Sequence, residues 1–259
     1  IVQLYGGNQD LKSDGNWRAA GGGSANEPWR FYMWDVERIL ENNRQRGTSP
    51  VGDLDRLRGQ LDDIEEYRIR FADHIHRMLY NDGVLTPENA AARWMNRAGE
   101  LDLAIVAESA RWGDTRQSNP LTRDEHWIPE QNRLIEDYFP VRTENVISNF
   151  RRSNLYPDTD APELLVNGDR QHGGFVNDGV AISFENPNAD NVGQLLYTLD
   201  GSDPRVEGGG VSPNALIYDS GSLPVTATTR VMARILNGEE WSALTDATFS
   251  FEAPASAEN

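Results

Sequence analysis

Cysteine is absent from this 259-residue chain, which excludes disulfides, cysteine-zinc sites and thiol catalysis. Lysine occurs once, at Lys12. Basic residues number 24 against 41 acidic ones, and the net charge of -17 argues against nucleic acid or an anionic membrane as a partner. No run of about 18 apolar residues is present, so we expect no segment to span a membrane.

The composition is otherwise ordinary. Hydrophobic residues make up 38% of the chain and charged residues 25%, as in globular proteins and unlike disordered segments. The length allows one or two domains with substantial cores. The first five residues, IVQLY, are hydrophobic and include neither an initiator methionine nor a signal peptide. We therefore expect the chain to be a processed or truncated piece of a longer protein.

Aromatic residues near the N-terminus surround a glycine-rich connection at residues 21–23. This arrangement predicts a short hairpin with strands at residues 17–20 and 29–34. Before it, residues 1–7 are apolar and end in two glycines, so they could close either a helix or a buried strand.

Three polar residues are spaced around this predicted hairpin. Asp10, Asn16 and Asp35 are candidates for a general base, an amide ligand and a metal-binding carboxylate, the set that a phosphoryl-transfer site uses. The alternative is a polar loop, because Asp and Asn are common turn residues. Glu37 could be a further ligand, or a favourable acid in the first turn of a helix.

Helices are predicted over most of the next 115 residues or so, where apolar residues recur every three or four positions. Thr86 and Pro87 are suited to begin one helix, which ends near Gly113. The predicted helices and their inward residues are: 36–45; one or two helices with Leu54, Leu57, Leu61, Ile64, Tyr67, Phe71, Ile75 and Met78; 87–113 with Trp94, Met95, Ala98, Leu101 and Ile105; a helix from Pro129 to Phe139 after a capping box at Thr122 and Glu125; and a last helix after Pro140 with Val146, Ile147 and Phe150.

The character of the chain changes at residues 156–161, a short linker rich in Pro and Asp. Beyond it apolar residues alternate, for example at Val231, Ala233 and Ile235, and Gly, Pro, Asn and Asp separate the runs. This period of two predicts an antiparallel sandwich of about seven strands. We therefore expect a multidomain α + β chain with a helical domain at 1–155, a β-domain at 162–253 and a tail at 254–259.

One motif in the predicted β-domain is specific. The segment YTLDGSDPR at residues 197–205, followed by TTRVMAR at 228–234 and WSA at 241–243, resembles the C-terminal domain of chitobiase and β-hexosaminidases. The resemblance implies an immunoglobulin-like sandwich without catalytic residues. Asp200 and Asp203 could bind calcium, but a turn in which these side chains bond their own backbone is the simpler interpretation.

The preceding part of the chain resembles the C-terminal part of the CotH kinase family of secreted atypical protein kinases. The matching segments are GNQD at 7–10, GNW at 15–17, WRFYMWD at 29–35, RFAD at 70–73, NDGVLT at 81–86, SARWGD at 109–114 and HWIPEQNRL at 126–134. The resemblance implies a kinase C-lobe-like domain that uses Mg²⁺ and ATP, at the cell surface or outside the cell. It also implies that Asp10 is the catalytic-loop acid and that Asn16 and Asp35 bind the metal ion.

The chain departs from this family in two respects. The nucleotide-binding lobe with its phosphate-contacting lysine should precede residue 1, and Lys12 does not match that lysine. Gly15 stands where the family often has His before the Asn-aromatic pair. We therefore expect the chain alone to be inactive and to need the missing N-terminal portion, from the same protein or from another chain. The residues that contact the nucleotide are not identified.

Two other functional classes fit the sequence. The chain could be a non-enzymatic extracellular scaffold or adhesion component that contacts another protein or a glycan. Trp241 and Tyr218 could then form a surface for sugar stacking, although strand aromatics are usually packed. A glycoside hydrolase fragment is the third class, and no acid pair in a barrel context supports it. His74 and His76 lie two residues apart on a predicted helix, face different directions, and make a poor metal pair.

Overall fold

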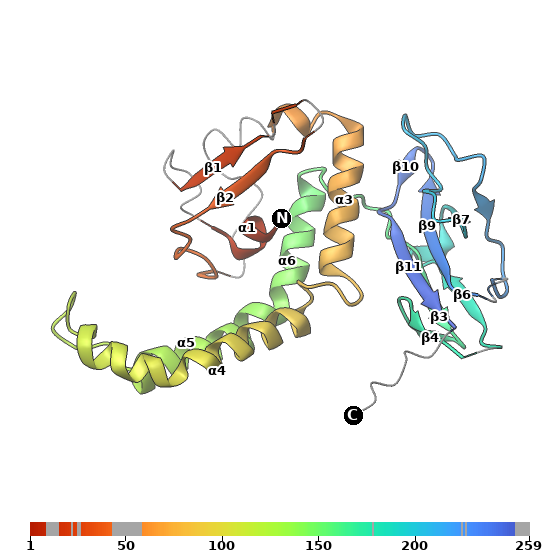
Figure 1. Cartoon of the computed structure of the whole chain (residues 1–259). Coiled ribbons are helices and arrows are strands. Elements are labelled where there is room, and N and C mark those ends of the chain that lie inside the picture. The colour runs from red at the N-terminus through yellow and green to blue at the C-terminus, as the bar shows by residue number, and fades with distance from the viewer. Residues whose placement is uncertain are drawn as a thin grey trace. The chain divides into compact units, whose positions relative to one another are not determined.

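The computed structural model describes residues 1–8, 16–21, 23–24, 27–42, 59–177, 179–223, 225 and 227–251. Helices and strands both occur, so the expected mixed α and β fold class is confirmed (Figure 1). The chain forms two compact units. The helical unit comprises residues 1–60 and 84–150, and the β-unit comprises residues 61–83 and 151–259. Within the described ranges, no helix has the length and apolarity needed to cross a bilayer.

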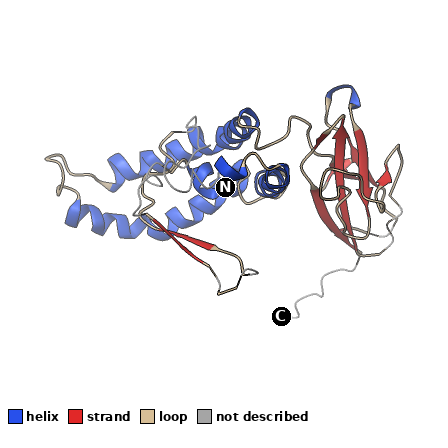
Figure 2. Ribbon diagram, turned by 90° about the horizontal axis from the view of Figure 1, so that it is seen from above, coloured by secondary structure: helices blue, strands red, loops and turns tan. Residues whose placement is uncertain are grey.

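The predicted N-terminal hairpin is confirmed. Strands β1 (Trp17–Ala20) and β2 (Arg30–Met33) pair antiparallel, with Trp17 opposite Met33 and Ala20 opposite Arg30. Figure 2 shows the two strands in red beside the helices of the helical unit. Before the hairpin, residues 2–6 form helix α1 (Val2–Gly6), which ends at Gly7 in the left-handed region with φ 65°. Glycine adopts this conformation at little cost, so it commonly ends helices.

Two buried side chains, Tyr138 and Arg142, bind the C-terminal end of α1. Arg142 is fully buried and donates from Nε to the carbonyl of Tyr5 at 2.7 Å and from Nη2 to the carbonyl of Leu4 at 3.0 Å. The Tyr138 hydroxyl donates to the same Tyr5 carbonyl at 3.0 Å. The last carbonyls of a helix lack partners within the helix, and these side chains supply them.

The helix predicted over residues 36–45 is absent from residues 36–42, and residues 43–45 lie outside the described part. Leu40 adopts φ 60°, which is incompatible with a helix. Its side chain is buried, its N–H donates to the Gly6 carbonyl at 2.7 Å, and its carbonyl accepts from Arg133 at 2.8 Å. These contacts with distant residues override the local helix signal.

Helix α4 (Pro87–Trp112) begins as predicted, with the Thr86 hydroxyl accepting from the Asn89 N–H. The predicted inward face is wrong at two positions, because Met95 is 48% exposed and Leu101 41% exposed. Ala98 is buried as expected. Figure 1 shows that α4 extends alongside the following helical segments, and Trp94 donates to Gln131 there at 2.7 Å. A helix that packs on one narrow side leaves part of its apolar stripe in solvent.

Helical backbone then continues from residue 123 to residue 152, so the breaks expected at Pro129 and Pro140 are absent. A π-helical turn precedes each proline: η1 before Pro129 and η2 before Pro140. Proline lacks an N–H and clashes with the carbonyl four residues back, and a wider turn with bonds to the fifth residue back accommodates it. The segments are η1 (Arg123–Trp127), α5 (Ile128–Arg133), η2 (Leu134–Tyr138) and α6 (Phe139–Arg152), and Val146, Ile147 and Phe150 of α6 are buried as predicted.

The described residues of the β-unit form two sheets. The larger has strand order β5-β11-β9-β7-β8 with β10 paired to β9, and the smaller has order β4-β3-β6. All pairs are antiparallel except β5 with β11. The strands are β3 (Glu163–Val166), β4 (Asp169–Arg170), β5 (Gly174–Phe175), β6 (Ile182–Glu185), β7 (Gln194–Thr198), β8 (Leu216–Ile217), β9 (Thr229–Asn237), β10 (Glu240–Trp241) and β11 (Thr245–Ser250), with a short 3-10 turn, η3 (Ala189–Asn191), before β7.

The predicted alternation builds the core of the β-unit. Side chains from both sheets join one buried cluster. Removing this apolar surface from water is the main favourable term in folding. The cluster includes Leu164, Ile182, Phe184, Leu195, Tyr197, Val231, Ala233, Ile235, Ala247 and Phe249.

Helix α3 (Glu65–Leu79) belongs to the β-unit. Ala72, Ile75 and Leu79 are buried. Of the predicted stripe, Ile75 is buried as expected, whereas Ile64 is 48% exposed, and Leu54 and Leu57 lie outside the described residues. The domain boundary at 156–161 stays a prediction. The compact units divide the chain differently, because α3 groups with the strands.

Candidate functional site

The hairpin brings two of the three predicted site residues to one end. Asn16 immediately precedes β1, and its carbonyl accepts the N–H of Trp34 at 3.2 Å, which extends the strand ladder by one pair. Asp35 follows directly, so Asn16 and Asp35 lie at the same open end of the hairpin. Asp10 lies outside the described residues.

Asp35 is exposed and has φ 54°. Asp tolerates this left-handed conformation better than most residues, and here it turns the chain away at the end of β2. Glu37 is exposed as well and is not in a helix, so its interpretation as an acid of a first helical turn is wrong.

The donor set at the hairpin end fits a magnesium ion in part. Mg²⁺ prefers oxygen ligands, keeps several waters, and is commonly held by one or two carboxylates together with substrate phosphates. An amide and a carboxylate match that preference. Among the described residues no group of three or more His, Asp and Glu side chains is arranged to hold a metal ion, so Asn16 and Asp35 would need the remaining ligands from elsewhere.

Aromatic side chains lie along the hairpin, from Trp29 near its turn to Trp34 at its open end. Trp17 and Phe31 pack with ring centroids 6.2 Å apart, and the guanidinium of Arg18 lies 4.8 Å from the centre of the Trp34 ring. Trp29 is 67% exposed and Tyr32 52%. Cation-π and ring contacts of this kind stabilise a two-stranded hairpin, which is only marginally stable by itself.

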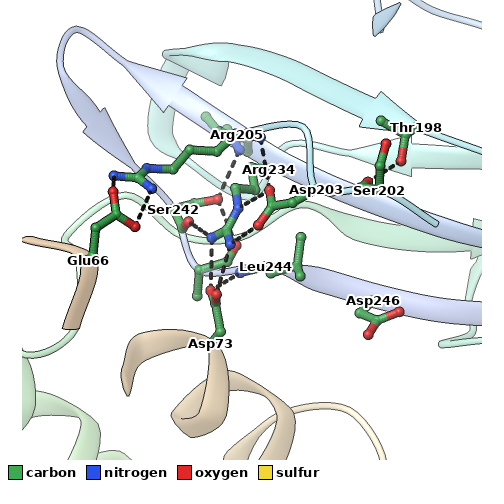
Figure 3. Close-up of polar contacts among 12 residues, drawn as sticks. Glu66, Asp73, Thr198, Ser202, Asp203, Arg205, Arg234, Ser242, Leu244 and Asp246 are labelled. Atoms are coloured by element: carbon green, nitrogen blue, oxygen red, sulfur yellow. Dashed lines mark hydrogen bonds and ion pairs between the residues drawn. The ribbon is translucent and has the colours of Figure 1, made fainter. Parts of the chain in front are cut away.

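In the β-unit, the DGSDP part of the recognised motif forms the self-bonded turn that the sequence predicts. Gly201 adopts φ 78°, and Asp200 Oδ1 accepts the Ser202 N–H at 2.8 Å. Asp203 Oδ1 accepts the Arg205 N–H at 2.9 Å. These bonds fix the turn and direct the Asp203 and Arg205 side chains toward α3 (Figure 3).

Asp203 then enters an ion-pair network around one buried arginine, which we name the Arg234 clamp: Arg234, Asp73 and Asp203. Arg234 on β9 is 1% exposed. Its Nε and Nη2 donate to Asp203 at 2.7 and 2.6 Å, and its Nη1 and Nη2 donate to Asp73 on α3 at 2.8 Å each (Figure 3). Burial disfavours the charge of Arg234, but the hydrogen bonds that it donates to both carboxylates outweigh this effect and raise its pKa.

Backbone groups complete the clamp. Arg234 Nη1 also donates to the Ser242 carbonyl at 2.9 Å, and Asp73 Oδ1 also accepts the Leu244 N–H at 2.8 Å. Planar guanidinium and carboxylate groups pair well in this two-bond geometry. The clamp therefore joins α3 to β9 and to the segment that leads into β11.

Arg205, like Arg234, forms ion pairs with acidic residues of α3. Arg205 donates from Nη1 to Glu66 at 3.0 Å and from Nη2 to Glu65 at 2.9 Å, both on α3. Glu66 also accepts the Gly208 N–H at 2.8 Å. The hydrogen bonds from Arg205, followed by that from Gly208, lower the pKa of Glu66.

The motif residues are therefore occupied in holding the fold, and a calcium role for Asp203 is not supported by its ion pair. Sequence reasoning missed Asp73, Arg205 and Arg234 as a network. A signal was present in Arg234, an arginine within the apolar run VMARIL of a strand. A buried charge in such a run requires a partner.

An aromatic cluster lies further toward the C-terminal end of α3. His76 is buried, its Nδ1 lies 3.0 Å from the Tyr156 hydroxyl, and its ring stacks on Tyr80 at 4.6 Å. Burial, reinforced by the positive charges of His172 and Arg234, lowers the pKa of His76 to about 3. His74 is exposed, so the prediction that the two histidines face different directions is confirmed.

A pocket of about 360 Å³ lies between α3, residues 154–157 and β10. Its walls include Glu65, Arg205 and Trp241. Arg205 is already paired, and Trp241 is 4% exposed and donates to the Gly209 carbonyl at 2.8 Å. The packed interpretation of Trp241 is therefore confirmed, and the Arg205 and Trp241 side chains of this pocket are engaged in contacts within the fold.

Comparison of the chain with protein-family models, with curated proteins and with solved structures found no match in any of the three. A functional proposal therefore rests on the chain's own motifs and on the geometry of its residues.

Proposed function

We propose that the chain is the C-terminal portion of a CotH-like atypical protein kinase of the cell surface or the extracellular space. Residues 5–155 would supply a C-lobe-like part, and residues 162–253 an immunoglobulin-like module of the chitobiase C-terminal type. The observation that carries the proposal is the placement of Asn16 and Asp35 at one end of the β1–β2 hairpin. An amide and a carboxylate from separate segments are the ligand pair that such a site uses.

In the intact protein, Asp10 would orient the acceptor hydroxyl of the protein substrate and accept its proton. The side-chain oxygens of Asn16 and Asp35 would hold Mg²⁺ beside the phosphates of ATP. The bound ion would stabilise the charge that develops on the transferred phosphoryl group. The nucleotide-binding lobe would come from the rest of the protein or from another chain.

A phosphotransfer assay on the full-length protein tests this proposal, with labelled ATP and Mg²⁺. The Asp35→Ala variant should lose at least about a hundredfold in rate, because a metal ligand supports several kcal/mol of charge stabilisation. Asp169→Ala, which removes an exposed carboxylate on β4, is the matched control and should retain activity. Equal rates for the wild-type protein and Asp35→Ala would refute the proposal.

A second candidate is a non-enzymatic extracellular scaffold or adhesion component. The observation in its favour is that Asp203, Arg205 and Arg234, from the segments that carry the β-domain resemblance, all serve to fasten α3. The sequence upstream of this segment separates the two candidates. A lysine on a strand of a nucleotide-binding lobe favours the kinase, and its absence favours the scaffold.

A further inference from the structure

The β-unit carries a second, larger pocket, which we name the Tyr218 pocket. It has a volume of about 620 Å³, within the range of about 300 to 1,000 Å³ that is typical of small-ligand sites. Its walls come from the end of β6, the loop around η3, the first residues of β7 and the loop after β8. The residues that matter here are Phe184, Asn186, Asn191, Gln194, Tyr218 and Asp219.

Tyr218 is a half-buried ring held firmly in place. Its hydroxyl donates to the Gly221 carbonyl at 2.7 Å, and its N–H donates to the Leu195 carbonyl at 2.9 Å. The ring meets Phe184 edge-on at 5.2 Å and Tyr197 edge-on at 6.2 Å. A fixed ring loses little conformational entropy when a ligand packs on it.

Several polar side chains around this ring are available to a ligand. Asn191, Gln194 and Ser220 are exposed, and across the described ranges none of them has a hydrogen-bond partner for its side chain. Asp219 uses one oxygen to accept the Ser220 N–H at 2.9 Å. The Asn186 side chain, in contrast, is hydrogen-bonded to the Val192 carbonyl and to Asn188, which fixes this wall of the pocket.

The charge of the lining limits the class of ligand. Among the described residues that line the pocket there is no Lys, Arg or His, and Asp219 is the one acidic residue. An anionic ligand such as a phosphate or a uronic acid would meet a carboxylate without a compensating cation. A purely apolar ligand would leave the amide groups unpaired, which costs free energy.

We propose that the Tyr218 pocket binds a short neutral glycan. Amide side chains both donate and accept hydrogen bonds, as sugar hydroxyls do, and the Asp219 carboxylate accepts from two hydroxyls at a time. The Tyr218 ring offers an apolar surface for the C–H face of a pyranose ring. This site is separate from Asn16 and Asp35, so its test is independent of the phosphotransfer assay.

Saturation-transfer NMR and calorimetry on the intact chain test the proposal, with a panel of neutral di- and trisaccharides of several linkages, matched acidic saccharides and short neutral peptides. At least one neutral saccharide should bind. Gln194→Ala and Asp219→Asn should each weaken that binding by about tenfold or more, which corresponds to about 1.4 kcal/mol. Both residues are exposed, so these variants should fold normally, as circular dichroism would verify.

Asp169→Asn on β4 is the control, because it removes an exposed charge outside the pocket and should leave the affinity unchanged. Three results would overturn the proposal: no binding of any neutral saccharide, affinities of the two pocket variants equal to that of the wild-type protein, or stronger binding of the acidic saccharides or the peptides.

Discussion

Two buried arginines, Arg142 and Arg234, bond their guanidinium groups to different kinds of partner. Arg142 donates to two backbone carbonyls of α1, and burial lowers its pKa. Arg234 lies between two carboxylates, and its pKa is raised. Such partners are required in both places, because a buried guanidinium without hydrogen-bond partners costs far more free energy than a buried apolar side chain.

The Arg234 clamp should be essential to the β-unit. Arg234→Met leaves the partly exposed carboxylates of Asp73 and Asp203 side by side without their buried cation, so we expect a loss of about 3 kcal/mol in stability. Hydrogen exchange measured on the full chain should show faster exchange of the β9 amides. Arg230→Met is the control, since the Arg230–Asp246 pair is exposed and such pairs contribute about 1 kcal/mol or less. Equal exchange in the two variants would contradict the prediction.

His76 should make the β-unit sensitive to acid. Its pKa in the folded state is about 3, whereas an unfolded histidine has a pKa of about 6.5. Between these values the unfolded chain binds the additional proton, so this residue lowers stability as the pH falls from about 6.5 to about 3. In this pH window, His76→Gln should lower the slope of the unfolding free energy against pH by an amount that corresponds to up to about one bound proton.

Thermal unfolding at a series of pH values measures this effect. His74→Gln on the same helix is the matched control, because the His74 side chain is exposed. If His76→Gln and His74→Gln give the same pH profile as the wild-type protein, His76 does not titrate on unfolding as inferred here.

Elements with strong local signals could be predicted from the sequence. The alternation at Val231, Ala233 and Ile235 predicted a buried strand face, and Thr86 with Pro87 predicted a helix start. The failures occurred where distant contacts decide the conformation. Leu40 is held out of a helix by Gly6 and Arg133, which no local pattern reveals.

The two candidate sites also differ in how far the sequence could predict them. The hairpin pattern could place Asn16 and Asp35 near each other, because strand pairing fixes their register. The Tyr218 pocket could not be predicted, since its walls come from four segments between residues 184 and 221. Tyr218 itself was a candidate for sugar stacking, but the amide side chains beside it are spread over loops that have no common motif.

Two substitutions on helix α4 test which of its side chains face the interior of the helical unit. Ala98 is buried whereas Leu103 is 84% exposed on the same helix. Ala98→Glu should destabilise the protein by about 2 kcal/mol or more, because it buries a charge in a packed place. Leu103→Glu should change stability by no more than about 0.5 kcal/mol. Thermal unfolding of both variants measures the difference, and a larger effect at Leu103 would show that its side chain is covered.

The whole molecule carries a large negative charge. A net charge of -17 makes the chain repel itself in the folded state, and salt screens this repulsion. Raising the ionic strength from about 0.01 M to about 0.1 M shortens the screening length from about 30 Å to about 10 Å. We therefore expect NaCl to raise the unfolding temperature. A fall would mean that attractive surface pairs such as Arg97–Glu100 outweigh the repulsion.

Screening and binding of a divalent cation can be separated in the same experiment. At an equal ionic strength of about 0.1 M, MgCl₂ and NaCl screen similarly, so a further rise in the unfolding temperature with MgCl₂ reports binding to the folded chain. If Asn16 and Asp35 hold Mg²⁺ as proposed, the Asp35→Ala variant should lose part of that further rise, while its response to NaCl should match that of the wild-type protein. Asp169→Ala removes the same charge from the β-unit and should respond to both salts like the wild-type protein. Identical responses of Asp35→Ala and Asp169→Ala to MgCl₂ would mean that carboxylates in general, and not the hairpin end, bind the cation.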